Sequence, residues 1–287
     1  MKLPGATILV SRGINVFEAA PAAYPYRSTK THGDWGMTWV IGASTIFGYG
    51  VVLSDTCVSC KKTGKRWNVL QKAFPLGKFI VGGLAGDIGT GLTMLRSLQK
   101  FLSDDPPPHG ECWEPEYVSE TWSKEARRLY NDIATNEITG PVHLLTVGVS
   151  PRPEVLGGAV PVVTVFRSPD FFPETVVGGN RAVSIGSGAQ VDKYREALEQ
   201  LFQVEDLVYL QGEVGNPGGF GRVVANLITH ESTLQPVDGI SPYFHYCCVR
   251  LGRIEVLTPN GMPEVVTNWP DLLQKIGSEM AGGPLVA

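Results

Sequence analysis

Residues 38–87 read TWVIGASTIFGYGVVLSDTCVSCKKTGKRWNVLQKAFPLGKFIVGGLAGD, and this stretch decides the fold because strand-like runs alternate in it with turn signals. A hairpin centred between Ile46 and Phe47 would place Thr38 directly opposite Asp55. Directly opposed residues share a face of the sheet, with Cβ atoms about 5 Å apart. The pattern therefore predicts that a hydroxyl and a carboxylate meet on one face.

Two further turns extend this alignment. The KKTGKR turn folds the chain back, which would set Asp55 opposite Lys72, and the following PLG corner would carry Lys72 toward Gly83. The register thus predicts one rung of a meander that holds Thr38, Asp55, Lys72 and Gly83 together. A bulge would shift this rung by one residue.

Composition narrows the class of protein. The chain has 287 residues, of which 43% are hydrophobic and 18% charged, enough for a sizeable core. A net charge of -4 and the absence of long basic runs argue against a nucleic-acid partner. No apolar run approaches the roughly 18 residues of a membrane span, and the first residues are too weakly apolar for a secretory signal. We therefore expect a cytoplasmic protein with no membrane partner.

Neither metal nor cofactor chemistry is indicated. Cys57 and Cys60 form a lone CxxC without a second pair of ligands, and alternate positions of a strand explain it better. An odd number of cysteines without framework spacing predicts reduced thiols at positions 57, 60, 112, 247 and 248. The five histidines show no metal-binding spacing, and the GLAGDIGTG segment lacks the GK[ST] of a phosphate-binding loop. We expect no metal site and no cofactor.

The order of elements predicts the fold class. Residues 1–37 show no sustained period and are interpreted as an N-terminal extension, and residues 38–287 as one domain. Helical periodicity covers residues 88–102 and about 122–137, and two more helices precede the last strands. The order along the chain is strands, two helices, strands, two helices and strands, and this order excludes an alternating βαβ fold. We predict an α+β protein, a four-layer αββα sandwich of two antiparallel sheets between helix pairs.

Five segments resemble a known family. MTWVIG, GVVLSDT, QKAFPLGKFIVGGLAGD, SIGSG and DGIS follow one another in the order, and near the spacing, found in the proteasome β-subunit group of N-terminal nucleophile (Ntn) hydrolases and its simpler bacterial relatives. The resemblance covers about residues 38–260, with local insertions at 104–121, 150–160 and 204–219. It implies the Ntn-hydrolase fold and an enzyme.

The resemblance implies roles for the four residues of the rung. Thr38 matches the nucleophile at the mature N-terminus, Asp55 the buried acid, and Lys72 the lysine that lowers the pKa of the hydroxyl. Gly83 matches the turn whose N–H forms the oxyanion hole. In this class the base is the α-amine of the threonine itself, whose ordinary pKa of roughly 8 suits neutral pH.

The resemblance implies further site residues elsewhere in the chain. Ser187 matches the serine near the amino terminus, and Asp238 and Ser241 match the D-x-x-S pair that orients Thr38 and its amine. An apolar pocket beside the nucleophile would be lined by Val58, Leu70, Val81 and Ala85.

The free amine requires that the bond before Thr38 be absent. The family's propeptides are usually cut after a glycine, whereas Met37 precedes Thr38 and Gly36 lies one residue further back. Alternatively, translation begins at Met37, and methionine aminopeptidase then exposes the small residue Thr38. Either route gives the same amine.

The resemblance implies a threonine-type endopeptidase subunit that acts on polypeptides and associates with itself into a ring or double ring. Taken singly, a strand threonine, a turn aspartate and an edge lysine are ordinary, but register and family order together favour the catalytic interpretation. Two alternatives remain open: an Ntn amidohydrolase acting on a small amide, and a non-catalytic structural subunit. The sequence does not specify an ATPase or adaptor partner.

Overall fold

The structure is a computed structural model of the chain. It describes eight ranges: 38–60, 64–104, 114–136, 139–155, 157–202, 217–237, 239–258 and 261–280. The N-terminal extension expected for residues 1–37 lies outside the described residues, as do parts of the three expected insertions.

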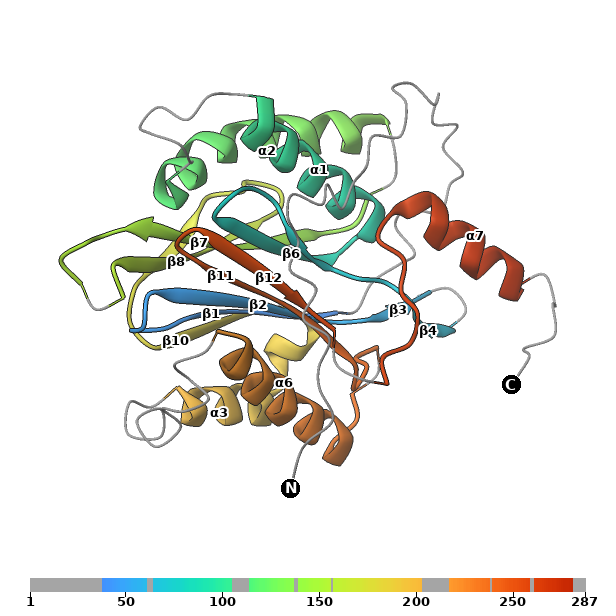
Figure 1. Cartoon of the computed structure of the whole chain (residues 1–287). Helices are drawn as coiled ribbons and strands as arrows, with labels where there is room; N and C mark the ends of the chain where they lie inside the picture. Colours follow the sequence, from blue (N-terminus) through green and yellow to red (C-terminus); the bar gives the residue numbers. More distant parts are fainter. Residues whose placement is uncertain are drawn as a thin grey trace.

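Two five-stranded antiparallel sheets form the centre of the molecule (Figure 1). The first has the order β10-β1-β2-β11-β12, with β1 (Trp39–Ser44), β2 (Tyr49–Asp55), β10 (Arg181–Gly186), β11 (Phe244–Arg250) and β12 (Arg253–Leu257). The second has the order β5-β6-β7-β8-β9, with β5 (Ala73–Pro75), β6 (Ile80–Gly86), β7 (Val142–Pro151), β8 (Ala159–Arg167) and β9 (Glu174–Val177). A separate ribbon pairs β3 (Cys57–Ser59) with β4 (Arg66–Asn68).

The two sheets share an apolar cluster to which both contribute. Val40 and Val52 come from the first sheet, and Leu145, Val147 and Val163 from the second. Glycines permit this close approach: a Cβ at Gly42 would lie 2.5 Å from Leu145 Cδ2, and one at Gly50 would lie 2.3 Å from Val147 Cγ1. The central strands are therefore buried on both faces, which explains why β1 and β2 are apolar without strict alternation.

Helices cover the outer faces of the sheets (Figure 1). Trp122 on α2 (Pro115–Asn136) and Leu95 on α1 (Ile88–Asp104) share a cluster with residues of the second sheet. On the first sheet, α3 (Asp192–Leu201) and α6 (Pro217–Leu234) bury a second cluster, preceded by the 3-10 turn η2 (Ser187–Gln190). The helix α7 (Trp269–Met280) packs beside α1. The predicted α+β class with antiparallel sheets is confirmed.

The predicted register of the first hairpin is wrong by one residue. Val40 pairs with Ser54, and continuing this register puts Trp39, rather than Thr38, opposite Asp55. The cause is the length of the turn. Three residues lie between Thr45 and Tyr49, whereas the predicted register requires an even number, and one of the three, Gly48, has φ 77°. A left-handed glycine closing a three-residue loop is one of the common hairpin connections.

The predicted meander is also wrong beyond Asp55. Cys57 pairs with Asn68, so Asp55 does not lie opposite Lys72, and Gly83 pairs with Ala73. The chain leaves the first sheet at this point and reaches the second through β5. The four residues of the expected rung therefore belong to two sheets.

One helix begins earlier than its periodicity indicates. The helix expected from about residue 122 starts at Pro115. Proline fits the first position of a helix because that N–H has no intrahelical acceptor in any case. The end of the expected insertion at 104–121 thus supplies the first two turns of α2.

A substitution that leaves a cavity tests the packing between the two sheets. Leu145 is fully buried there, so Leu145→Ala should lower the free energy of unfolding by about 2–5 kcal/mol, through lost burial and an unfilled cavity. Urea denaturation measures this difference. Leu251→Ala, at a side chain that is 45% exposed, is the matched control and should change stability by less than about 0.5 kcal/mol. Equal effects of the two substitutions would contradict the described packing.

Candidate functional site

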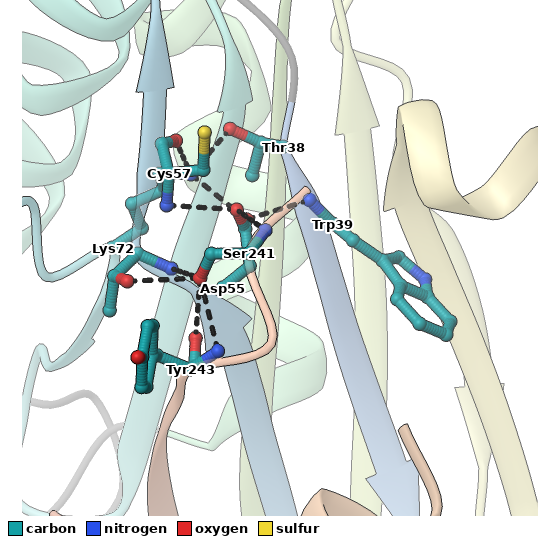
Figure 2. Close-up of polar contacts among 8 residues, drawn as sticks. Thr38, Trp39, Asp55, Cys57, Lys72, Ser241 and Tyr243 are labelled. Atoms are coloured by element: carbon teal, nitrogen blue, oxygen red, sulfur yellow. Dashed lines mark hydrogen bonds and ion pairs between the residues drawn. The ribbon is translucent and has the colours of Figure 1, made fainter. Parts of the chain in front are cut away.

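Thr38, Asp55 and Lys72 meet although the register that predicted their meeting is wrong. Thr38 directly precedes β1, Asp55 ends β2, and Lys72 directly precedes β5 of the other sheet. All three residues are fully buried, and Figure 2 shows their polar atoms in one group. The ends of strands from both sheets therefore bring together the hydroxyl, the carboxylate and the amine.

Lys72 is the centre of this group. Its Nζ donates hydrogen bonds to Thr38 Oγ1 at 2.8 Å and to Asp55 Oδ1 at 2.9 Å. A third bond, of 2.5 Å, goes to the main-chain oxygen of Cys57. Three acceptors match the three donors of a protonated amine, so the geometry fits a lysine ammonium directed at the threonine hydroxyl.

Asp55 receives hydrogen bonds on both oxygens. Oδ1 accepts from Lys72 Nζ and from the main-chain N–H of Trp39 at 2.9 Å. Oδ2 accepts from the N–H groups of Cys57, at 2.9 Å, and Ser241, at 3.4 Å. Four donors suit an ionised carboxylate. Burial raises the pKa of Asp55 above its ordinary value, while the charge of Lys72 and the N–H groups of Trp39 and Cys57 act against that rise.

Ser241 joins this group of residues from a distant part of the chain, and its role in orienting Thr38 stays a prediction. Its Oγ lies 3.0 Å from Thr56 Oγ1 and accepts from Thr56 N at 3.3 Å. The same hydroxyl donates to the oxygen of Tyr243 at 3.0 Å. Ser241 thus ties the loop before β11 to the end of β2. Asp238, its expected companion, lies outside the described residues.

Ser187 contacts Thr38 through its main chain. Its N–H donates to the Thr38 oxygen at 2.7 Å. Gly186 makes this approach possible: it has φ 88°, and a Cβ there would lie 2.0 Å from the Thr38 oxygen. This position of the SIGSG segment therefore requires glycine.

The expected oxyanion-hole residue lies beside the lysine. A Cβ at Gly83 would lie 2.7 Å from Val40 Cγ1 and 3.2 Å from the oxygen of Lys72. Gly83 is therefore a point of close contact between the sheets near the site. Its role as oxyanion donor stays a prediction.

The four residues expected to line a substrate pocket are fully buried. Val58 and Leu70 belong to the cluster beneath α1 and α2, whereas Val81 and Ala85 belong to the cluster between the sheets. Ala85 lies beside the turn that contacts Thr38, because a Cβ built at Gly186 would lie 3.1 Å from the Ala85 Cβ. Their role in substrate binding stays a prediction.

Cys57 is the other possible nucleophile in the group. Burial, and secondarily the charge of Asp55, raises the pKa of its thiol to about 11. Because only the thiolate attacks readily, this raised pKa makes Cys57 a poor nucleophile at neutral pH.

Sequence reasoning missed the main-chain donors of the site. Trp39 and Cys57 each donate an N–H to Asp55, and the oxygen of Cys57 receives Lys72. Such contacts depend on the position of the backbone and not on the side chain, so no residue type in the sequence indicates them. The one signal in the sequence for these two residues is that they lie close to Thr38 and Asp55.

A second buried polar pair lies one residue away from Asp55. His245 pairs with Ser54 across β11 and β2, and both side chains are buried. Neither His245 Nε2 nor Ser54 Oγ has a hydrogen-bond partner among the described residues, while His245 Nδ1 lies 3.4 Å from Thr258 Oγ1. Burial lowers the pKa of His245 to about 4, so its ring is neutral at pH 7.

The described residues contain no group of three or more His, Cys, Asp or Glu side chains placed to hold a metal ion. Among the described helices, none combines the length and the apolar character needed to cross a membrane.

No model of a known protein family matches the chain, and no curated protein matches it with significant similarity. The functional inference therefore depends on the motifs and on the geometry of the site.

Lys72→Met tests whether the ion pair is stabilised as described. Removing the ammonium leaves Asp55 as an unpaired buried charge, so the free energy of unfolding at pH 7 should fall by about 3–5 kcal/mol. Lys124→Met, at an exposed position on α2, is the matched control and should be nearly neutral. Chemical denaturation measures both. A loss below about 1 kcal/mol for Lys72→Met would contradict the ion pair.

His245 predicts an acid-sensitive stability. The unfolded chain binds a proton at this histidine below pH about 6.5, but the folded chain binds it only below about 4. The neutral ring of His245 thus stabilises the fold above pH 6.5, and this contribution is lost as the pH falls toward 4. The loss in the free energy of unfolding between pH 7 and pH 5 is about 2 kcal/mol.

His245→Gln should remove this part of the pH dependence, because glutamine does not titrate. His230→Gln, at an exposed position of α6, should leave it intact. Denaturation curves at pH 7 and pH 5 give the two differences, and an unchanged pH dependence in His245→Gln would refute the assignment.

Proposed function

We propose that the protein is a threonine-type endopeptidase subunit of a proteasome-like assembly, in which Thr38 becomes the N-terminal nucleophile. One observation carries the proposal: Lys72 Nζ lies 2.8 Å from Thr38 Oγ1 while Asp55 holds the same amine at 2.9 Å. A buried cation directed at a hydroxyl lowers the free energy of the alkoxide, which is what a threonine nucleophile requires.

The fold supports this proposal. The structure has two facing antiparallel sheets, with helices α1 and α2 on one outer face and α3 and α6 on the other, and the proposed Ntn-hydrolase sandwich requires such layers (Figure 1). Thr38 lies directly before β1, an inner strand of the first sheet.

The chemistry begins once the bond between Met37 and Thr38 is absent. The free α-amine of Thr38 takes the proton of Oγ1, and Oγ1 attacks the carbonyl carbon of the substrate. Lys72 donates a hydrogen bond to Oγ1 throughout, and the N–H of Gly83 would stabilise the tetrahedral oxyanion.

The intermediate then collapses to an ester on Oγ1. The proton held by the α-amine passes to the leaving amine of the substrate. A water molecule next gives its proton to the α-amine and attacks the ester, which releases the carboxylic acid and restores the threonine hydroxyl. Asp55 stays ionised and keeps the lysine in place.

Peptide hydrolysis by a chain that starts at Thr38 tests the proposal. Thr38→Ala should lower the rate by about a thousandfold or more, because it removes the nucleophile, whereas Thr38→Ser should retain part of the activity. Thr45→Ala, which removes a buried hydroxyl from the turn of the same hairpin, is the control for folding and should hydrolyse like the wild type. Intact mass verifies the N-terminus of each protein.

Equal hydrolysis by wild type and Thr38→Ala would end the nucleophile assignment. Native mass measured on the same samples addresses assembly. A monomer that cleaves small amides but not peptides would favour an Ntn amidohydrolase, and an inactive oligomer with a free Thr38 would favour a structural subunit.

A further inference from the structure

The residue after the nucleophile is held by an aromatic stack. The Trp39 indole is 1% exposed and lies against the ring of Tyr194 on α3, with ring centroids 4.6 Å apart and planes 16° from parallel. Phe244 closes the stack from the side, edge-on at 6.1 Å. Trp39 therefore has a fixed position relative to α3, and the adjoining Thr38 is constrained with it.

Tyr194 also makes a hydrogen bond that leads back to the site. Its hydroxyl donates to the main-chain oxygen of Gln235 at 2.6 Å. Burial raises the pKa of Tyr194 above its usual value, so the hydroxyl keeps the proton that it donates. Gln235 lies six residues before Ser241, whose N–H reaches Asp55, and between them the Ile240 N–H donates to the oxygen of Val237 at 3.2 Å.

Asp55 and Tyr194 each contact the same two parts of the chain. Asp55 accepts from Trp39 on one oxygen and from Ser241 on the other. Tyr194 stacks on Trp39 and bonds to Gln235, which lies six residues before Ser241. Tyr194 thus contacts residue 39 and the start of the stretch that leads to residue 241.

The 3-10 turn before α3 fits tightly around the same tryptophan. A Cβ at Gly188 would lie 2.2 Å from Trp39 Cγ, just as one at Gly186 would meet the oxygen of Thr38. The turn that follows β10 therefore packs against residues 38 and 39 with no room for a side chain at positions 186 and 188. Tyr194, six residues beyond Gly188, belongs to the same continuous piece of chain.

We propose that Tyr194 and Trp39 are positioning residues, which fix Thr38 relative to the segment 239–241 through the stack and the hydrogen bond to Gln235. The catalytic consequence rests on the proposed function, but the positional link does not. An aromatic pair that only filled the core would contribute general stability. A positioning pair couples two segments that are distant in the sequence.

Tyr194→Phe tests the link because it keeps the stack and removes the hydrogen bond. The matched control is Tyr130→Phe on α2, whose hydroxyl likewise donates to a main-chain oxygen, that of Gly140 at 3.2 Å, and whose ring contacts Phe171. Hydrogen exchange read by mass spectrometry on the chain should show roughly tenfold faster exchange at residues 38–41 and 239–243 in Tyr194→Phe. Tyr130→Phe should leave both segments unchanged.

Kinetics supply the second measurement. In a chain that starts at Thr38, Tyr194→Phe should lower kcat about tenfold with KM unchanged, since the substrate contacts remain while the nucleophile is less well placed. Tyr194→Leu, which also removes the stack, should lower kcat further. Tyr130→Phe should match the wild type.

Several outcomes would overturn the inference. Unchanged exchange at both segments in Tyr194→Phe would refute the link, and faster exchange across the whole chain would mark Tyr194 as a core residue only. Faster local exchange with unchanged kcat would refute the catalytic consequence. If the wild type and Thr38→Ala are equally inactive, the proposed function fails, while the exchange result still decides whether Tyr194 couples the segments.

Discussion

The rest of the site depends on the buried ammonium of Lys72. Burying a charge is costly unless the charge is paired and its hydrogen-bond donors have acceptors. Here a carboxylate, a hydroxyl and a main-chain oxygen accept the three hydrogen bonds of the ammonium. The acceptors belong to β2, to β3 and to the residue before β1, whereas the lysine itself begins the path into the second sheet. The ion pair therefore fastens the ends of the two sheets together, and the hydroxyl of Thr38 is one of its necessary partners.

Main-chain groups hold most of this arrangement. Asp55 accepts N–H bonds from Trp39, Cys57 and Ser241, and the oxygen of Thr38 accepts one from Ser187. Such contacts constrain the path of the backbone. The side chains of Trp39 and Ser241 add further contacts, the stack on Tyr194 and the hydrogen bond to the oxygen of Tyr243.

Parts of the fold could be predicted from the sequence, whereas the strand registers could not. Alternating runs and turn signals led to both sheets. In the structure the Ser187 N–H meets the oxygen of Thr38, and the Ser241 N–H meets Asp55. The hairpin register failed by one residue because the left-handed Gly48 sets the loop length, and single-sequence patterns do not reveal that conformation. The meander failed because the chain changes sheets after Asp55. Contacts such as that between Trp39 and Tyr194 depend on tertiary packing, which leaves no local signal.

Covalent labelling tests the central claim most directly, namely that Lys72 and the free amine make Thr38 a nucleophile. A chain beginning at Thr38 would be exposed to a peptide β-lactone, an electrophile that acylates an activated hydroxyl, and the adduct located by peptide mass spectrometry. The account predicts one adduct, on Oγ1 of Thr38, that is absent when Met37 is still attached. Labelling that is absent from Thr38, or that is unaffected by Met37, would contradict it.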